Sequence, residues 1–427
     1  MTEAAVVTAS TERPVPKGWR WVRLGTVIIG SQPGFASGDR DPQGTVQIRM
    51  NNVDTDGSWV WDQLTRVPTN SDTVRRFRIE AGDVLFNNTN STELVGKSAV
   101  FTAFSEPVVY SNHFTRLRVQ PSELDSRFLG SWLRLLWKER FFERICNRWI
   151  GQSAVKADKL LNLEIPLPPV TEQRRISDLL ENSFGAIQRM QAAAEAQLET
   201  VTVLAARCIS AAFGSQMNCE WEVRTIGDQL KDGTLIAHQD GNHGEFYPRA
   251  SEFVQSGVRF ITAKQLLADG RIDFQSAPCL TPARAQELRI GHGLGQDVLL
   301  AHNATVGRVG IVPPNCPQFV IGTSVTAFRP DHSRLDPLFL FFALQAPRFQ
   351  QQLIDFMKQS TRNQVPITRQ RELSLPVPPI SEQRTLATRL MKQTAHTHAM
   401  KITVAEQLEA IRLLSAAVLR RAFNGEL

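Results

Sequence analysis

The segment PLPPVTEQRRI at residues 166–176 returns as PVPPISEQRTL at residues 376–386, 210 positions later. The two copies differ in chemical character at one place, where Arg175 is matched by Thr385. The same offset continues downstream and pairs Phe213 with Phe423. Since a solenoid repeat has a period of only about 20–50 residues, we interpret this spacing as the duplication of a whole module.

Each proline-rich segment precedes a long stretch that is rich in Ala, Leu, Gln and Glu. Consecutive prolines disfavour helix before them, and Thr171 and Ser381 are suitable N-cap residues. We therefore predict two helices, within residues 166–216 and 376–427, each of about 42 residues and about 60 Å long.

Apolar residues recur at seven-residue spacing along both predicted helices. The rows are Leu180, Ile187, Ala194, Val201 and Cys208 in the first helix, and Leu390, Val404, Ile411 and Val418 in the second. A long helix with such a stripe needs a partner to bury it. We expect the two helices to pair with each other as an antiparallel coiled coil.

The residues before each helix are interpreted as a compact domain of mixed helices and strands. Both domains open on a Trp, contain an Asp-Gly turn signal after a strand-like run, and continue into a short apolar strand and a polar loop. The expected strands lie at 84–86 and 298–300, and helical pieces at 128–144 and 337–357 close the domains. The predicted fold class is α+β, with domains at 16–165 and 217–375, a pseudo-two-fold internal repeat, and a disordered tail at residues 1–15.

Composition restricts the class of protein. The 427 residues hold 48 Lys and Arg against 42 Asp and Glu, and the sequence pI is about 9.2, which is compatible with an anionic partner. Five unclustered cysteines match neither a disulfide framework nor a zinc site, so free thiols in the cytoplasm are expected. The most apolar stretch, residues 335–344, is too short to span a bilayer.

Motifs for catalysis are missing or incomplete. There is no methyltransferase tetrapeptide and no nucleophile elbow, and the glycines of residues 291–295 lack dinucleotide-binding spacing. Gly96-Lys97-Ser98 ends like a P-loop, but Ser91 stands where the first glycine belongs. His238, Asp240 and His243 could ligate a metal, although a plain glycine-rich loop explains them more simply.

Taken together, the motifs resemble the specificity subunit of type I restriction-modification systems. The resemblance rests on the two Glu-Gln-Arg segments, on Gly-Asp-Val-Leu-Phe at 82–86, on Val-Gly-Arg-Val-Gly at 306–310 and on Arg-Ala-Phe-Asn-Gly-Glu-Leu at 421–427. It covers nearly the whole chain. One departure is Gln296, which stands where a Gly is expected before Asp297 and leaves that turn open.

The resemblance implies a non-catalytic DNA-recognition subunit. Each globular domain would be a target recognition domain that reads one half of a split, asymmetric DNA target, and the helical pair would be the spacer between the halves. Two modification subunits would dock on the chain and methylate adenine N6 with S-adenosylmethionine, and a motor-nuclease subunit would join them. S-adenosylmethionine, ATP and Mg would be bound by these partners, and this chain would bind no cofactor.

Direct readout of bases uses Arg or Lys on guanine and Asn or Gln on adenine. The candidates in the first domain are Arg49, Asn51, Asn52, Asn87, Asn88, Asn90 and Lys97. The candidates in the second domain are Lys264, Gln265, His302, Asn303, Thr305, Arg308, Arg362 and Asn363. The candidates for binding partner subunits are Glu172, Gln173, Arg174, Glu382, Gln383 and Arg384. The alternative is that these residues are loop polars that cap turns.

Two other hypotheses remain open. A stand-alone DNA methyltransferase or nuclease would need a catalytic motif, and a two-ended protein scaffold would have no role on DNA. Trp59 and Trp61 alternate with polar residues and could face DNA, but packing in a half-buried strand is the simpler interpretation.

Overall fold

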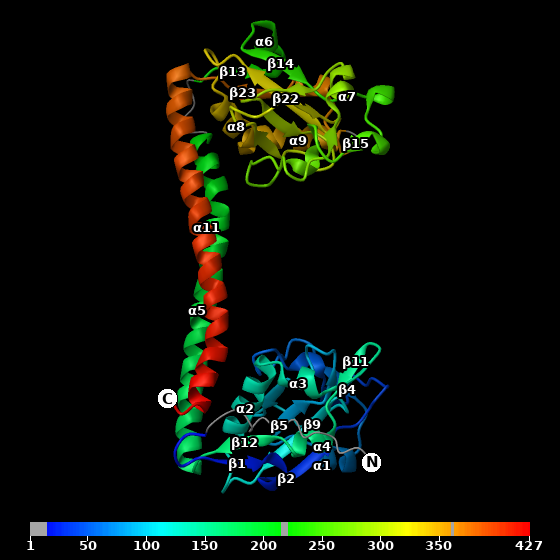
Figure 1. Cartoon of the computed structure of the whole chain (residues 1–427), viewed down its shortest axis with the longest axis vertical. Helices are drawn as coiled ribbons and strands as arrows, with labels where there is room; N and C mark the ends of the chain where they lie inside the picture. The colour runs from blue at the N-terminus through cyan, green and yellow to red at the C-terminus, as the bar shows by residue number, and fades with distance from the viewer. Residues whose placement is uncertain (1–14, 215–220, 360–362) are drawn as a thin grey trace. The chain divides into compact units, whose positions relative to one another are not determined.

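The computed structural model describes residues 15–214, 221–359 and 363–427, and the chain forms two compact units (Figure 1). Unit 1 comprises Met1–Glu195 with Glu406–Leu427, and unit 2 comprises Ala196–Ala405. Each unit therefore combines one globular domain with parts of both long helices. No helix within the described ranges is long and apolar enough to cross a membrane.

The domain of unit 1 is built on two sheets. The larger sheet is antiparallel and has the order β2 (Ile28–Pro33), β9 (Phe114–Val119), β5 (Val84–Asn87), β7 (Ser98–Val100). The second sheet has the order β4 (Thr65–Val67), β3 (Thr45–Ile48), β8 (Val108–Tyr110), and β3 and β8 are parallel. The smaller sheets are β1 (Arg20–Arg23) with β12 (Glu164–Leu167), and β10 (Asn147–Trp149) with β11 (Gln152–Ala154) and β6 (Thr89–Asn90). The helices of this domain are α1 (Ser71–Phe77), α2 (Ser126–Lys138), α3 (Phe141–Ile145) and α4 (Ala157–Leu161).

The domain of unit 2 repeats this plan. Its first sheet has the order β14 (Leu235–Gln239), β22 (Val325–Pro330), β19 (Val298–Ala301), β20 (Val309–Ile311). Its second sheet has the order β15 (Phe253–Val254), β17 (Cys279–Leu280), β16 (Val258–Ile261), β21 (Phe319–Ile321), β18 (His292–Gly293), and β13 (Val223–Thr225) pairs with β23 (Ser374–Pro376). The helices are α6 (Ile226–Lys231), α7 (Pro282–Glu287), α8 (Pro337–Gln345), α9 (Pro347–Lys358) and α10 (Ile367–Gln370).

The two predicted strands are confirmed as β5 and β19, whereas each predicted helical piece is two helices. In unit 1 the break falls at Arg140, which adopts a left-handed conformation between α2 and α3. In unit 2 the break falls at Ala346, because Pro347 opens α9 and cannot donate a hydrogen bond to α8. The mixed fold class is confirmed.

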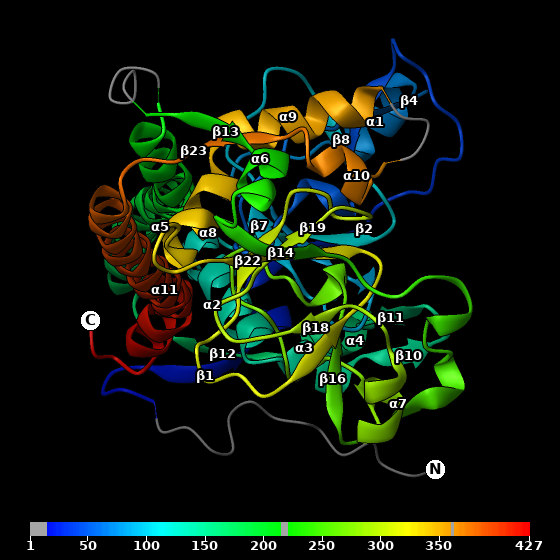
Figure 2. The same cartoon turned by 90° about the horizontal axis from the view of Figure 1, so that it is seen from above.

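The two long helices are α5 (Val170–Ala212) and α11 (Ile380–Phe423), and they pack side by side in opposite directions (Figures 1 and 2). The predicted seam is largely buried: Leu180, Ile187, Ala194, Val201, Leu390 and Val404 are among the buried residues. The predicted N-caps are wrong, since Thr171 and Ser381 lie inside the first turn. The helices begin directly after the prolines, and the Pro169 and Pro379 carbonyls accept the first helical hydrogen bonds.

The C-terminal end of each long helix completes a hydrophobic core. In unit 1, Phe423 of α11 lies 5.0 Å from the rings of both Phe128 and Trp132 on α2. In unit 2, Phe213, which follows α5, lies 5.6 Å from Phe339 on α8. The two phenylalanines that the repeat pairs in sequence thus occupy corresponding places in the two units.

The glutamine of the repeated motif is buried in both units. In unit 1, the Gln173 side chain accepts a hydrogen bond from the Asp125 backbone N–H at 2.8 Å and donates to the carbonyls of Glu123 at 2.8 Å and Pro168 at 2.9 Å. Asp125 is the N-cap of α2. One amide therefore joins the first turn of α5 to the start of α2.

Gln383 makes the same three bonds in unit 2. It accepts from the N–H of Asp336, the N-cap of α8, at 2.9 Å, and donates to Arg334 at 3.1 Å and Pro378 at 2.7 Å. We call this arrangement the glutamine clasp. Both side chains were expected at a partner surface, but the structure buries them completely, while Arg174, Glu382 and Arg384 are exposed and Glu172 is half-buried.

Loss of a clasp should destabilise the unit that contains it. Gln173→Ala and Gln383→Ala each leave a buried N–H and two carbonyls unpaired, so we expect the free energy of unfolding to fall by about 2–4 kcal/mol. The neighbouring exposed change Arg174→Ala is the control and should cost less than about 0.5 kcal/mol. Urea denaturation measures both values, and equal effects of Gln173→Ala and Arg174→Ala would contradict the clasp.

A second repeated feature is a buried carboxylate at the start of a central strand. Asp83 accepts two hydrogen bonds from Arg118, at 2.7 and 2.8 Å, and Asp297 accepts two from Arg329, at 2.8 and 2.7 Å. Both carboxylates are nearly inaccessible. Each pair links neighbouring strands of the first sheet, β5 with β9 and β19 with β22.

The turn before each carboxylate is retained although its residue differs. Gly82 has φ +89° and Gln296 has φ +68°, so the glutamine adopts the left-handed conformation that its glycine counterpart adopts freely. This resolves the turn that the sequence left open.

Gln296 should therefore carry local strain that glycine would relieve. We expect Gln296→Gly to raise the free energy of unfolding by about 1 kcal/mol, and the reciprocal Gly82→Gln to lower it by about 1 kcal/mol. The added side chain at Gly82 meets only ordinary van der Waals contact, so backbone conformation is the variable being tested. Thermal unfolding of the two variants should shift in opposite directions, and a shift of both downward would argue against strain.

Candidate nucleic-acid interface

Corresponding polar loops follow strands β5 and β19. In unit 1 the loop of residues 88–97 is closed by Asn87 N–H to Lys97 O at 2.7 Å and by Gly96 N–H to Asn87 O at 2.8 Å. In unit 2 the loop of residues 302–308 is closed by Ala301 N–H to Arg308 O at 2.8 Å and by Gly307 N–H to Ala301 O at 2.9 Å. We call them the unit 1 loop and the unit 2 loop. The two loops are closed by the same pair of backbone hydrogen bonds, but they differ in length and in their side chains.

Two observations favour glycine where each loop closes, at Gly96 and Gly307, and the steric one is stronger at Gly96. Both have φ near +90°, a conformation that suits glycine. A Cβ atom would also collide with the ring of Phe142 at Gly96 and with the Gln350 side chain at Gly307.

The asparagines of the unit 1 loop largely organise the loop itself. Asn87 is completely buried; it donates to His113 O at 2.9 Å and accepts from Asn90 Nδ2 at 2.6 Å. Asn88 donates to Thr115 Oγ1 at 2.9 Å. Asn88 and Asn90 are half-buried, so they retain some access to a ligand, whereas Asn87 has none.

The basic residue after each loop glycine anchors the loop to the turn that follows a strand of the second sheet, β3 in unit 1 and β16 in unit 2. Lys97 is buried and its Nζ donates to Val53 O at 2.6 Å and Met50 O at 3.3 Å; burial lowers the pKa of its amine. Arg308 donates to Leu266 O at 3.2 Å, which is the corresponding bond, although its side chain is exposed. Lys97 therefore acts by holding the loop in place. Arg308 also holds its loop, but its exposed guanidinium has further N–H groups that a ligand could reach.

Asn52 and Gln265 are also supports. Each closes the short 3₁₀ turn in which it lies, η2 (Met50–Asn52) or η5 (Ala263–Gln265), because its side-chain oxygen accepts from a backbone N–H three residues earlier. The distances are 2.9 Å to Arg49 N and 3.1 Å to Thr262 N. Both side chains are buried.

Two arginines and a histidine lie beside the unit 1 loop. Arg49 is half-buried and donates to Ser37 O at 3.2 Å. Burial and the neighbouring Arg40 lower the pKa of Arg49, and burial and Arg49 lower the pKa of His113. Mutual repulsion of this kind is relieved by an anion. The sequence did not point to Arg40 or His113, because both stand far from the unit 1 loop motif along the chain.

In unit 2 the accessible candidates are Lys264 and Asn363, which are exposed, and Asn303 and Thr305, which are half-buried. His302 is buried, and desolvation lowers its pKa, so the imidazole is favoured in its neutral form. Asn51 in unit 1 is likewise exposed, while Arg362 lies outside the described residues.

The possible metal residues do not converge. His243 Nε2 lies 2.9 Å from Asp240 Oδ2, whereas His238 Nε2 is hydrogen-bonded to Gln370 Oε1 at 3.1 Å. Across the ranges that the structure covers, no group of three or more His, Cys, Asp or Glu could hold a metal.

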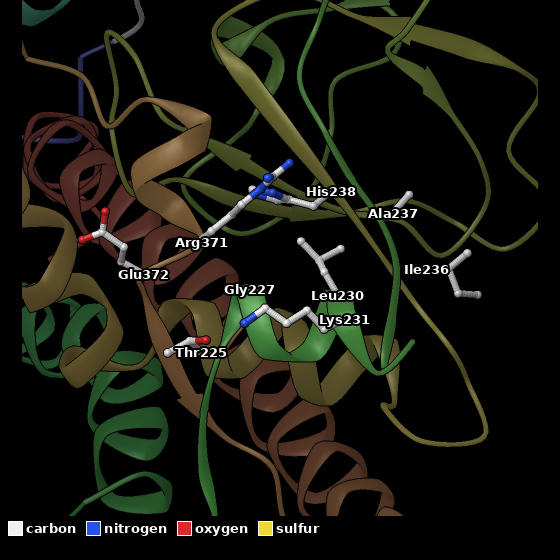
Figure 3. Close-up of a pocket in the computed structure, with 9 residues that line it drawn as sticks. All are labelled: Thr225, Gly227, Leu230, Lys231, Ile236, Ala237, His238, Arg371 and Glu372. Carbon is white, nitrogen blue, oxygen red and sulfur yellow. The ribbon is translucent and has the colours of Figure 1, made fainter.

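An open hollow of about 740 Å³ lies beside His238 in unit 2 (Figure 3). Its lining is Thr225, Gly227, Leu230, Lys231, Ile236, Ala237, His238, Arg371 and Glu372. Burial lowers the pKa of His238 to about 4, so its ring is neutral near pH 7. The hydroxyl of Thr225 in the lining donates to the Asp228 carboxylate at 2.7 Å and accepts from the Asp228 N–H at 3.0 Å, so it caps the start of α6.

The two tryptophans of the first domain pack inside it. Trp59 stacks on Trp61 at 5.3 Å, Trp61 stacks on Phe104 at 4.3 Å, and Trp59 Nε1 donates to Val100 O at 2.9 Å. The packing interpretation is confirmed.

Comparison with known proteins identifies the class of subunit. The family model described as type I restriction modification DNA specificity domain matches residues 16–200 and 287–410, and the chain belongs to this family. Such specificity subunits serve DNA sequence recognition and are non-catalytic, the activity lying in other subunits of the system.

Individual relatives are distant but similar over most of their length. The chain is 24% identical over 336 residues to the putative type I restriction enzyme MjaX specificity subunit of Methanocaldococcus jannaschii, which covers 74% of this chain and 72% of that protein. It is 21% identical over 356 residues to the EcoBI specificity subunit of Escherichia coli, covering 78% and 73%.

Two solved structures share the fold. One, from a study of complex assembly and conformational transition of the type I R-M system, has a TM-score of 0.72 at 23% identity and covers 97% of this chain and 100% of that chain. The crystal structure of the HsdS subunit from Thermoanaerobacter tengcongensis has a TM-score of 0.66 at 21% identity, with 98% and 99% covered.

The buried Lys97 and the exposed Lys264 should differ in how much each contributes to the free energy of unfolding. Lys97→Ala leaves the Val53 and Met50 carbonyls without their donor and should lower the free energy of unfolding by about 2 kcal/mol. Lys264→Ala removes an exposed side chain and should change it by less than about 0.5 kcal/mol. Urea denaturation makes the comparison. A Lys97→Ala protein with full stability but reduced DNA binding would show that the amine acts on DNA.

Proposed function

We propose that this chain recognises a bipartite, asymmetric double-stranded DNA target, with each unit reading one half. The observation that carries the proposal is a shared frame with different loops. The glutamine clasp, the buried Asp–Arg pair and the anchor of the loop to the turn after β3 or β16 occur in both units. The loops held on this frame differ in length and in side chains, as two different half-sites require.

The proposed contacts to DNA are the candidates that remain accessible. In unit 1 they are Arg49, Asn51, Asn88 and Asn90, joined by Arg40 and His113. In unit 2 they are Lys264, Asn303, Thr305, Arg308 and Asn363. Arg362 lies outside the described residues and is proposed from its place in the sequence alone. The buried Asn52, Asn87, Lys97, Gln265 and His302 would act by holding the contact residues in place. Arg and Asn side chains in such positions can pair with guanine or adenine edges, and phosphate contacts would fix the register.

The proposed protein partners are two copies of a modification subunit, and a motor-nuclease subunit. Exposed apolar residues on α5 have exposed apolar counterparts on α11, 210 residues later. This correspondence supports two equivalent docking faces, one for each copy. Met190 is 48% exposed and its counterpart Met400 is 39% exposed. Val203 and Leu413 are a second such pair, at 39% and 72%. The first turns of the same helices carry the remaining candidates for partner binding, namely the exposed Arg174, Glu382 and Arg384 and the half-buried Glu172.

The chemistry would reside in these partners. S-adenosylmethionine would be bound by the modification subunits, and ATP and Mg by the motor-nuclease. The described residues of this chain assemble no catalytic group, which favours this division over a stand-alone methyltransferase or nuclease. A protein scaffold without a role on DNA would select no duplex sequence, so a measurement of DNA sequence selectivity decides between that hypothesis and ours.

Selection from a random duplex pool tests the two-part target. The chain is co-expressed with its modification subunit, and the purified complex is used for enrichment. We expect two short conserved blocks separated by unread positions. Combined Arg49→Ala and Asn51→Ala should relax or weaken one block, by about 1–3 kcal/mol per lost base contact, and Lys264→Ala should affect only the other.

Ile29→Ala changes an exposed side chain on strand β2, outside the candidate contact residues, so it serves as the control and should leave both blocks unchanged. A single continuous block, or substitutions in one unit that alter both blocks equally, would contradict the assignment of one half-site to each unit. Absence of any enriched sequence would favour the scaffold.

A further inference from the structure

We infer that the tip of the β10–β11 hairpin, Trp149 with Ile150, is an apolar wedge that enters the DNA beside the half-site read by unit 1. This inference rests on the proposed function and goes beyond it, because it assigns a DNA-deforming element to one unit. It is argued from exposure, attachment and charge.

The tip exposes apolar surface to an unusual degree. Ile150 is 106% exposed and Trp149 is 59% exposed, and Ile150 is the most exposed large apolar side chain in the described part of the chain. Gly151 follows with φ +79° and closes the turn. Surface isoleucines are common singly, but a tryptophan and an isoleucine together at a projecting turn gain free energy only when something covers them.

The hairpin is firmly attached to the unit 1 loop. Strand β11 pairs with β6, which lies within that loop, so that Ser153 is opposite Asn90 and Ala154 opposite Thr89. The hydroxyls of Thr92 and Ser153 are also hydrogen-bonded at 2.8 Å. A ligand held by the loop therefore has the tip as an immediate neighbour.

The root of the hairpin is fixed as well. Lys159 donates to Ile145 O at 2.6 Å and to Asn147 Oδ1 at 3.2 Å, which ties α4 to the start of β10. The apolar tip thus projects from a braced strand pair.

Charge around the hairpin favours a polyanion as the occupant. Residues 140–159 contain five Arg and Lys against two Asp and Glu. Arg148, directly before Trp149, and Lys156 are exposed. An apolar tip between cations matches DNA, whose phosphates flank apolar base steps. Isoleucine is among the side chains that separate base pairs in this way and kink the duplex.

The sequence of the other unit differs at the corresponding positions. The 210-residue offset relates Trp149 to Gln359 and Ile150 to Ser360, both polar. The wedge would therefore deform the DNA at one half-site only, and would add specificity for an easily unstacked step that no side chain reads directly.

The test uses the complex of the full chain with its modification subunit and duplexes that carry the selected target. 2-Aminopurine, whose fluorescence rises when it is unstacked, is placed at successive positions. We expect one position at the unit 1 half-site, other than the adenine that the modification subunit itself unstacks for methylation, to brighten several-fold on binding. Ile150→Ser should abolish the rise and weaken binding roughly tenfold. Ile29→Ser is the matched control, because Ile29 is 61% exposed in the same unit but lies on β2.

The outcomes are distinct. Brightening that Ile150→Ser removes and Ile29→Ser preserves supports the wedge. The wedge is overturned if no such position brightens in the wild-type complex, if that position still brightens with Ile150→Ser, or if Ile150→Ser prevents assembly with the modification subunit, since the tip would then be a protein contact. A wild-type complex that selects no duplex sequence overturns the proposed function itself.

Discussion

The buried amide of the glutamine clasp is the constraint on which the rest of the structure depends. A long helix can present its side chains usefully to a neighbouring domain only if its direction is fixed where it begins. Gln173 and Gln383 achieve this by bonding both to their own helix entrance and to the N-cap of a domain helix. Three hydrogen bonds from one rigid amide define both position and rotation. The proline-rich strands β12 and β23 deliver the chain to this point.

Much of the fold could be predicted from the sequence because duplication marks it. The offset between Pro166 and Pro376 located both long helices, and alternating apolar runs located β5 and β19. The helix starts were misplaced because Thr171 and Ser381 look like caps in isolation. What decides the start is the Pro169 or Pro379 carbonyl and a glutamine that bonds to another helix, and such tertiary bonds leave no local signal.

The candidate site could be predicted less well, because tertiary contacts also decide which polar side chains stay accessible. Asparagine and lysine are the side chains that read bases, and they are equally the side chains that satisfy buried backbone groups. Asn87 and Lys97 serve the second purpose in the structure, whereas Asn51 and Lys264 remain exposed. Sequence cannot separate these uses, because the distinction depends on which carbonyls come within reach. Arg40 and His113 were missed for a related reason, since only folding brings them to Arg49.

The seating of Phe423 between Phe128 and Trp132 has a consequence for biosynthesis. The core of unit 1 is closed by residues that the ribosome makes only after all of unit 2 has been translated. Until then a nascent unit 1 presents an uncovered aromatic surface, which is a natural binding site for a chaperone. Translation that stops early would leave this surface open, so an incomplete chain cannot close the core of its first unit.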